Sequence, residues 1–177
     1  TVVRSGCMAK DADMILSEFI LLGIGGKELS EENAAQTAKA LNIIQPDFIR
    51  VHATGIKLES KLGEFVRDGS FTLQSEEEIV IEQKLFLQQL HEMDSYYVNE
   101  HIVNLLLEVR GNLRTEKQEM LSTIDRFLTL PPDERLLFTV GRRLNIFFRL
   151  DDLKKPKLHQ KAGESLQQIL SKNPHVD

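Results

Sequence analysis

One segment, residues 19–50, constrains the fold more than the rest of the chain. It holds an apolar run from Phe19, glycines at 23, 25 and 26, a helix-favouring stretch from Ser30, and a second apolar run directly after Pro46. This order predicts a strand, a glycine turn, a helix and a second strand. The connection between the helix and the second strand is very short, which favours a parallel right-handed crossover over a hairpin. The chain is therefore expected to be an α/β protein.

The same reasoning extends along the chain. The run at 17–23 is continuous and apolar, which predicts a strand buried on both faces, and Ser30 is expected to cap the helix that follows. Further strands are expected at 48–53 and 95–98. Helices are expected at 61–67, 75–91, 100–109, 116–130, 133–144 and 161–171; a capping box at Ser75 and Glu78 opens the second, and Thr115 with Gln118 is expected to cap the fourth. The pattern indicates about three strands followed by helices.

Composition excludes several classes of function. The formal net charge of −5 gives no electrostatic reason to expect a nucleic acid or an anionic membrane as partner. No apolar run approaches the ~20 residues that span a bilayer. A single cysteine, Cys7, excludes an internal disulfide and suits a reducing compartment, so the cytoplasm is the expected location.

Polar residues and glycines lie at the ends of the expected strands, where ligands gather in parallel α/β folds. Gly23, Gly25 and Gly26 allow a ligand to approach the backbone, although they lack the spacing of a dinucleotide site and serve equally well to turn the chain. Arg50 and His52 lie two positions apart and share one face of a strand. They suit either a polar active-site wall or an ion pair at a strand end.

His101 and Asn104 form a third polar group, with both side chains near one face of the expected helix. Asn104 serves either a site or a bridge between helices. His91 and Glu92 lie upstream, but no HExxH or other compact ligand spacing occurs, so no metal site is predicted.

Four stretches carry a family resemblance, namely 22–50, Val-Arg-Asp-Gly-Ser-Phe at 66–71, Asp-Ser-Tyr-Tyr-Val-Asn-Glu-His at 94–101 and Ile-Asp-Arg-Phe at 124–127. Together they resemble the later half of the radical S-adenosylmethionine (SAM) barrel, in the branch that includes oxygen-independent coproporphyrinogen oxidase-like proteins and methylthiotransferases. The resemblance implies a partial parallel (β/α) barrel over 1–99 and a helical extension over 100–150. For 151–177 the charged residues themselves predict a linker followed by a weak tail helix. The resemblance also implies cofactor contacts at Gly23, Gly25, Gly26 and Arg50, and substrate contacts at His52, His101 and Asn104.

Two features of that family are missing. The three cysteines of CxxxCxxC, which hold the [4Fe-4S] cluster, are absent, and residues 53–60 stand where many relatives have Pro-Gly-Thr-Pro. We therefore expect the C-terminal portion of a radical SAM-like protein, inactive alone and holding no cofactor itself, with SAM and [4Fe-4S] implied for the intact protein. The alternative is a non-catalytic α/β module for interaction or small-molecule binding. The expected partner is a missing N-terminal barrel half, or a second copy through an open sheet edge.

Overall fold

The computed structural model describes residues 1–57 and 59–172, and over this range the chain is a mixed α/β protein. The elements in order are α1 (Val2–Asp11), β1 (Ser17–Leu22), α2 (Ser30–Ile44), β2 (Phe48–Ala53), α3 (Lys61–Arg67), α4 (Glu76–Gln89), β3 (Tyr96–Val98), β4 (Gly111–Asn112), α5 (Lys117–Leu128), α6 (Pro132–Arg143), the 3-10 helix η1 (Leu150–Lys154) and α7 (Pro156–Lys172).

The four strands form one sheet in the order β1-β2-β3-β4. β1, β2 and β3 are parallel, with Phe19 opposite Arg50 and Arg50 opposite Val98. The predicted parallel crossover from β1 through α2 to β2 is confirmed. A fourth strand, β4, was not expected; it runs antiparallel to β3, pairing Tyr97 with Gly111.

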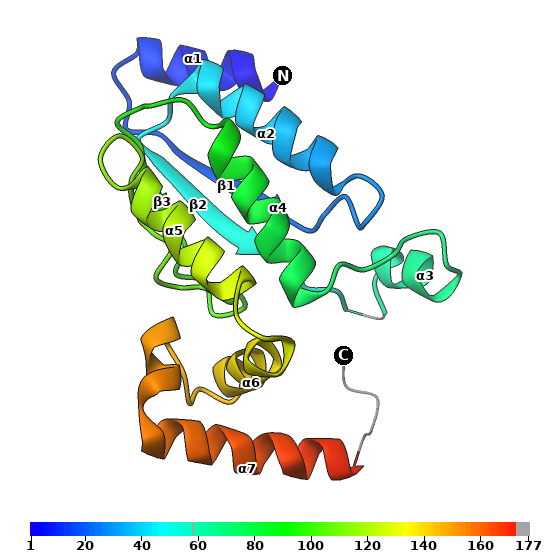
Figure 1. The fold of residues 1–177 in the computed structure, drawn as a ribbon. Coiled ribbons are helices and arrows are strands. Elements are labelled where there is room, and N and C mark those ends of the chain that lie inside the picture. Colours follow the sequence, from blue (N-terminus) through cyan, green and yellow to red (C-terminus); the bar gives the residue numbers. More distant parts are fainter. Residues whose placement is uncertain (58, 173–177) are drawn as a thin grey trace.

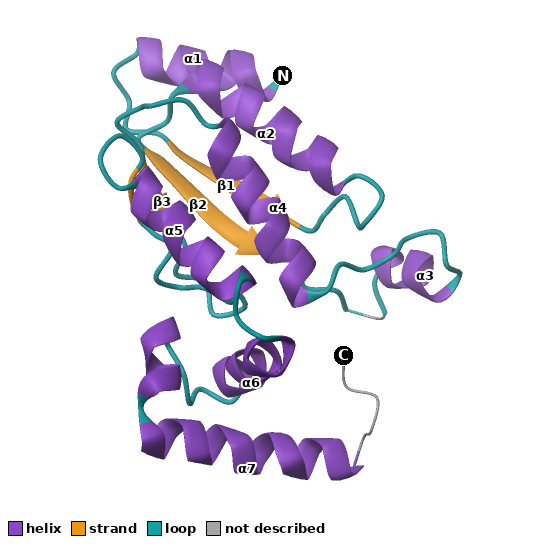
Figure 2. Cartoon of the chain, in the orientation of Figure 1, coloured by secondary structure: helices purple, strands orange, loops and turns teal. Residues whose placement is uncertain are grey.

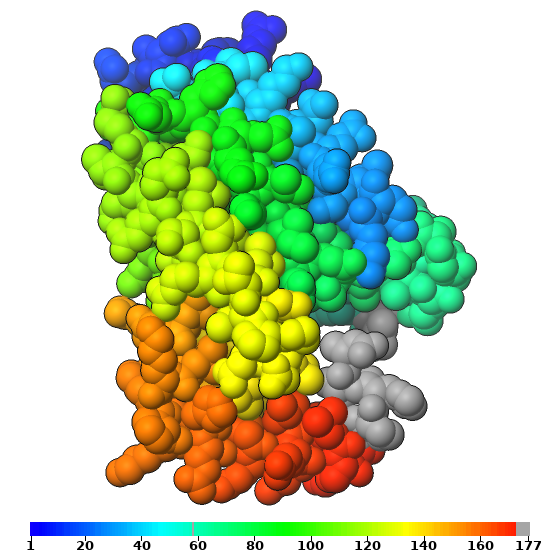
Figure 3. Space-filling view, in the orientation of Figure 1, coloured from blue at the N-terminus to red at the C-terminus, as the bar shows by residue number. Residues whose placement is uncertain are grey.

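Helices α2, α4 and α5 cover one face of the sheet (Figure 1; Figure 2). Viewed from this side, their side chains form a continuous layer over the strands (Figure 3). The sheet contributes every second residue to the core beneath them, namely Ile20, Leu22, Ile49, Val51 and Tyr97. Burying these side chains from water drives the packing of the two layers.

The opposite face of the sheet is not covered by a helix in the described part of the chain. Phe19 and Leu21 are 64% and 47% exposed, so the expectation that β1 is buried on both faces is wrong. The physical reason is the number of layers. A two-layer fold buries only alternate residues of a strand, and a continuous apolar run does not reveal which half stays open.

The helix expected at 100–109 is also absent, and the segment forms turns between β3 and β4. The side chain of Asn99 donates to the carbonyl of Leu106 at 2.7 Å, and that of Asn104 donates to the carbonyl of Val51. Asparagine side chains that bond backbone groups in this way compete with helix formation. The segment is therefore fixed by tertiary hydrogen bonds.

Helix boundaries follow the predictions where local capping sets them. The capping box of α4 is confirmed, because Ser75 accepts from the amide of Glu78 and Glu78 accepts from the amide of Ser75. The caps predicted at Ser30 and Thr115 are wrong. Helix α2 has Leu29 at its N-cap and α5 has Glu116, and neither side chain caps its helix.

The two ends of the chain are more helical than predicted. Residues 2–11, which carry no clear pattern, form α1, where Gly6 packs closely on Ile44 at the end of α2. The tail helix begins at Pro156, five residues earlier than expected, because proline is well suited to a first helical position. Residues 173–177 of the predicted tail lie outside the described range, as does residue 58.

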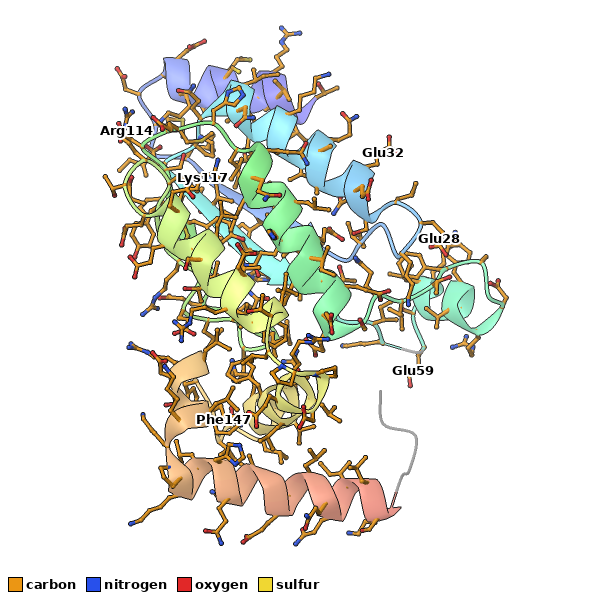
Figure 4. All side chains as sticks on the ribbon, in the orientation of Figure 1. Glu28, Glu32, Glu59, Arg114, Lys117 and Phe147 are labelled. Carbon is orange, nitrogen blue, oxygen red and sulfur yellow. The ribbon has the colours of Figure 1, made fainter. Side chains whose placement is uncertain are left out.

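Helices α6 and α7 with η1 form a small cluster next to the carboxyl end of β2 (Figure 1). Its aromatic centre is Phe147, which Figure 4 shows beside α6 and whose ring stacks on Phe138 with centroids 5.9 Å apart. Phe147 also lies directly against Gly141, where a Cβ atom would come within 2.3 Å of the Phe147 ring. Phe138 contacts Phe127 of α5 and so joins the cluster to the main core.

Candidate functional site

The open face of the sheet carries the polar residues predicted for strand β2. Arg50 and His52 alternate with the buried Ile49 and Val51, so both point away from the covering helices, as their spacing predicts. We use the name open face for the strand residues on this side, namely Ser17, Phe19, Leu21, Phe48, Arg50, His52, Tyr96 and Val98. None of these eight side chains is a carboxylate.

Arg50 is held in place at the centre of the open face. Its Nε donates to Ser17 Oγ at 3.1 Å. Its guanidinium carbon lies 6.0 Å from the centroid of the Phe19 ring and 5.9 Å from that of Phe48. Cation–π contacts of this kind orient the guanidinium without neutralising it. No carboxylate in the described part of the chain forms an ion pair with Arg50.

His52 and His101 form a stacked pair beside Arg50. Their ring centroids are 4.0 Å apart with an interplanar angle of 21°, and Phe19 meets the His52 ring edge-on at 5.4 Å. Burial lowers the pKa of His52, and the charges of His101 and Arg50 lower it further. His52 therefore favours the neutral imidazole more than a histidine in water does.

Asn104 fixes the segment that carries His101. Its Oδ1 accepts from the amide of Ala53 at 2.8 Å, and its Nδ2 donates to the carbonyl of Val51 at 2.7 Å and to Asn99. The side chain thus bonds β2 as a neighbouring strand would, just beyond the end of β3. Asn104 is 4% exposed and has no room for a ligand, so its observed contacts are those of a bridge between segments.

Arginines of α6 hold the same segment from the other side. Arg143 donates to the carbonyl of Val103 at 3.0 Å and forms an ion pair with Glu76. Arg142 is buried against Ile102 and Phe148, with its Nε lacking a hydrogen-bond partner. Burial lowers the pKa of Arg142, and the charge of Arg143 adds to that effect. The C-terminal helices therefore help to position His101 over β2.

The glycine turn after β1 is bonded from inside the protein. Glu82 of α4 is fully buried, and its carboxylate accepts from the amide of Gly23 at 3.1 Å, from Asn33 at 2.7 Å and from Ser30 at 2.9 Å. Gly23 follows β1, and Ser30 and Asn33 lie in the first turn of α2, so Glu82 takes up donors from both ends of the glycine turn.

Gly25 and Gly26 are packed closely in the same turn. A Cβ on Gly25 would lie 2.9 Å from the carbonyl oxygen of Leu29, and one on Gly26 would lie 2.9 Å from that of Thr72. Gly26 also has a φ of +64°, which favours glycine. These contacts explain the glycines by chain packing, while a cofactor contact at this turn stays a prediction.

Sequence reasoning missed Glu82, although a signal for it exists. The residue lies three positions after Ile79 and four before Phe86, on the side of α4 that packs on the sheet. A charged residue on the apolar side of a helix is rarely buried without partners, and so indicates a buried hydrogen-bond network.

A polar cleft of about 550 Å³ lies between α5 and the segments before β4 and η1, and Tyr96 of the open face also lines it. Its charged groups already serve the fold. Arg126 pairs with Asp151, Arg110 pairs with Glu100, and Glu108 accepts from the amide of Leu150.

Metal ligands do not converge within residues 1–57 and 59–172, where no group of three or more His, Cys, Asp or Glu side chains suits an ion. Cys7 lies on α1, which packs on the end of α2 that precedes β2, and so it is remote from the carboxyl ends of the strands. None of the described helices is long and apolar enough to cross a membrane.

Comparison with known proteins gives no relative. No protein-family model matches the chain, and neither the curated proteins nor the solved structures include a significant match. Of the predicted site residues, the structure brings Arg50, His52 and His101 together on the open face, places Asn104 behind them, and bonds the glycine turn to the helix layer.

Proposed function

We propose that the parallel strands β1, β2 and β3 form one wall of an α/β barrel in a radical SAM-like protein. The observation that carries the proposal is the uneven covering of the sheet. Within the described residues helices lie on one face only, and the open face presents Arg50, His52 and the stacked His101. In a parallel barrel the helices lie outside and the opposite face of every strand points inward. On this proposal the open face lines the interior.

The chain itself does not fit the iron–sulfur cluster of that family. Cys7 is the single cysteine, and it lies on α1 away from the candidate site. A [4Fe-4S] cluster takes three or four thiolates, so this chain would contribute the wall and substrate-side residues while other residues of the intact protein hold the cluster and SAM. The reaction would be SAM-dependent radical chemistry, and a cytoplasmic location stays part of the proposal.

The test begins with the reading frame upstream of Thr1. We expect it to continue in frame into three cysteines spaced as CxxxCxxC. The extended protein, reconstituted anaerobically, should show a [4Fe-4S] spectrum and release 5′-deoxyadenosine from SAM. A frame with no such cysteines, or a reconstituted protein that does not cleave SAM, would overturn the proposal.

The buried Glu82 favours a second candidate, a non-catalytic interaction module. Because Glu82 occupies the amide of Gly23 and the hydroxyl of Ser30, it removes the donors that a small-molecule site at the glycine turn would use. The exposed Phe19 and Leu21 remain as apolar contact surface. An upstream frame without the cysteine motif, together with a protein partner that protects β1 from hydrogen exchange, would support this candidate instead.

A further inference from the structure

We propose that Arg50, His52 and His101 form a binding site for the oxyanion group of a small ligand, a carboxylate or a phosphate, with an affinity that rises as the pH falls. This site depends on the charged side chains beside the open face and does not depend on the barrel proposal. Three independent observations support the oxyanion site.

The first observation is the state of Arg50. Its Nε is used by Ser17 and its flat face lies near Phe19 and Phe48, so the side chain is oriented but its charge has no carboxylate partner in the described chain. The terminal nitrogens of an oriented guanidinium present parallel N–H donors, which suit the two oxygens of a carboxylate or phosphate. Contact with these aromatic rings restricts the rotation of the Arg50 side chain more than is usual for a surface arginine.

The second observation is the sign of the charge on the side chains around Arg50. The chain has 27 acidic and 22 basic residues, yet the eight side chains of the open face include no carboxylate. The acid nearest to His101 in sequence is Glu100, and Glu100 is paired with Arg110. An anion approaching Arg50 along the strands would therefore meet positive or neutral side chains, in a protein whose overall charge is negative.

The third observation is the stacked pair of His52 and His101. Arg50 on the same strand and His101 on the facing segment are the charged groups that bear on His52, and Phe19 faces it from β1. Burial lowers the pKa of His52, and repulsion from the stacked His101 ring, whose centroid is 4.0 Å away, lowers it further, so His52 resists protonation while the site is empty. An anion beside them compensates that repulsion, and each added proton in turn strengthens the attraction for the anion.

The test measures sulfate and acetate binding to the 177-residue chain at about pH 8 and about pH 5.5, on either side of the ordinary histidine pKa of about 6.5. The Cε1 proton signals of His52 and His101 report binding by NMR. We expect at least one anion to bind about tenfold more tightly at the lower pH and to raise the pKa of one or both histidines. The anion that binds more tightly identifies the chemical class of the ligand. Tighter binding of sulfate indicates a phosphate group, and tighter binding of acetate indicates a carboxylate.

Matched variants separate the site from general charge effects. Arg50→Gln should abolish most of the binding, and His101→Gln should remove much of its pH dependence. Arg4→Gln, which removes the same charge from an exposed position on α1, should change neither. Each variant is first shown to unfold in urea with an unchanged midpoint. Binding of neither anion, equal affinity at both pH values, or equal loss in Arg50→Gln and Arg4→Gln would overturn the proposal.

Discussion

Glu82 and Gly23 lie 59 positions apart in sequence, and the carboxylate of the one accepts a hydrogen bond from the amide of the other. Because Glu82 also bonds Ser30 and Asn33, a single buried side chain ties together the end of β1, the start of α2 and the middle of α4. This bond shows that the glycine turn is organised from within the core.

Replacing Glu82 with glutamine should destabilise the fold. The amide keeps the shape of the carboxylate but turns one acceptor into a donor that faces the Gly23 amide or the Ser30 hydroxyl. Leaving a buried polar group unsatisfied costs about 1–3 kcal/mol in the free energy of unfolding. Urea denaturation measures the loss, with Glu32→Gln as control, since Glu32 is exposed at the same end of α2 (Figure 4). Equal stability of the two variants would contradict the assigned network.

Asn104 should behave as a bridge that positions His101. Asn104→Leu keeps a similar volume and removes the bonds to Val51, Ala53 and Asn99. We expect a loss of roughly 2–3 kcal/mol, because several buried backbone groups lose their partner. The ring-current shift between His52 and His101 should also shrink in the NMR spectrum. Gln118→Ala, on the exposed side of α5, is the control; an unchanged imidazole pair in Asn104→Leu would contradict the positioning role.

Two helical glycines should respond in opposite directions to alanine. A Cβ at Gly141 would lie 2.3 Å from the ring of Phe147, whereas one at Gly163 would meet no atom within 4 Å. Gly141→Ala should therefore destabilise by about 1–3 kcal/mol through overpacking. Gly163→Ala should stabilise α7 by about 0.5–1 kcal/mol through helix propensity. Thermal unfolding of both variants tests the packing of the C-terminal helices, and a stabilising Gly141→Ala would show that Phe147 packs elsewhere.

Acid should weaken the attachment of α1. The amide of Leu16 donates to Asp47, the ammonium of Lys10 pairs with it, and both hold the pKa of that carboxyl below its usual range. The pKa is about 3.9 in the unfolded chain, so this stabilisation is complete above that value and is lost as the pH falls through the lower folded pKa. Between about pH 5 and pH 2 the stability of Asp47→Asn should thus fall less steeply than that of the parent. Asp11→Asn, at an exposed position on α1, should show the same pH dependence of stability as the parent. If the stability of Asp47→Asn falls as steeply as that of the parent, Asp47 does not cause the loss in acid.

How far the sequence predicts this structure depends on the range of the interactions involved. The capping box at Ser75 and the turn at Pro46 act within a few residues, and the elements that they delimit occur as expected. The helix predicted at 100–109 is wrong because Asn99 and Asn104 bond backbone groups outside any local helix. Such bonds exist only once the fold has formed.

In the candidate site too, local sequence patterns predict some features, while others depend on tertiary contacts. The two-residue spacing of Arg50 and His52 places them on one face of β2, which strand geometry alone predicts. Their contact with His101 depends on the Asn104 bridge and on the arginines of α6, so no local sequence pattern predicts it. The burial of Glu82 was foreseeable from its place on the apolar side of α4, but its partners were not.

The edge of the sheet should make the chain associate with itself. β1 pairs with β2 on one side only, and in the described chain no strand lies on its other side. Helix α1 packs on α2 and leaves that edge open. Exposed edges of this kind pair with other strands, and Phe19 and Leu21 add apolar surface beside the edge. We therefore expect a homodimer or larger oligomer at micromolar concentration, seen as a concentration-dependent sedimentation coefficient.

The exposure of Leu21 allows a direct test of that contact. Because Leu21 is 47% exposed and points away from the core, Leu21→Lys should weaken association while changing the free energy of unfolding by about 1 kcal/mol or less. Ile43→Lys, at a residue 56% exposed on α2, adds the same charge away from the edge and should leave association unchanged. A strictly monomeric parent with amides of β1 protected from hydrogen exchange would show that the edge is already satisfied. In that case both self-association and the open-wall picture of the sheet would have to be abandoned.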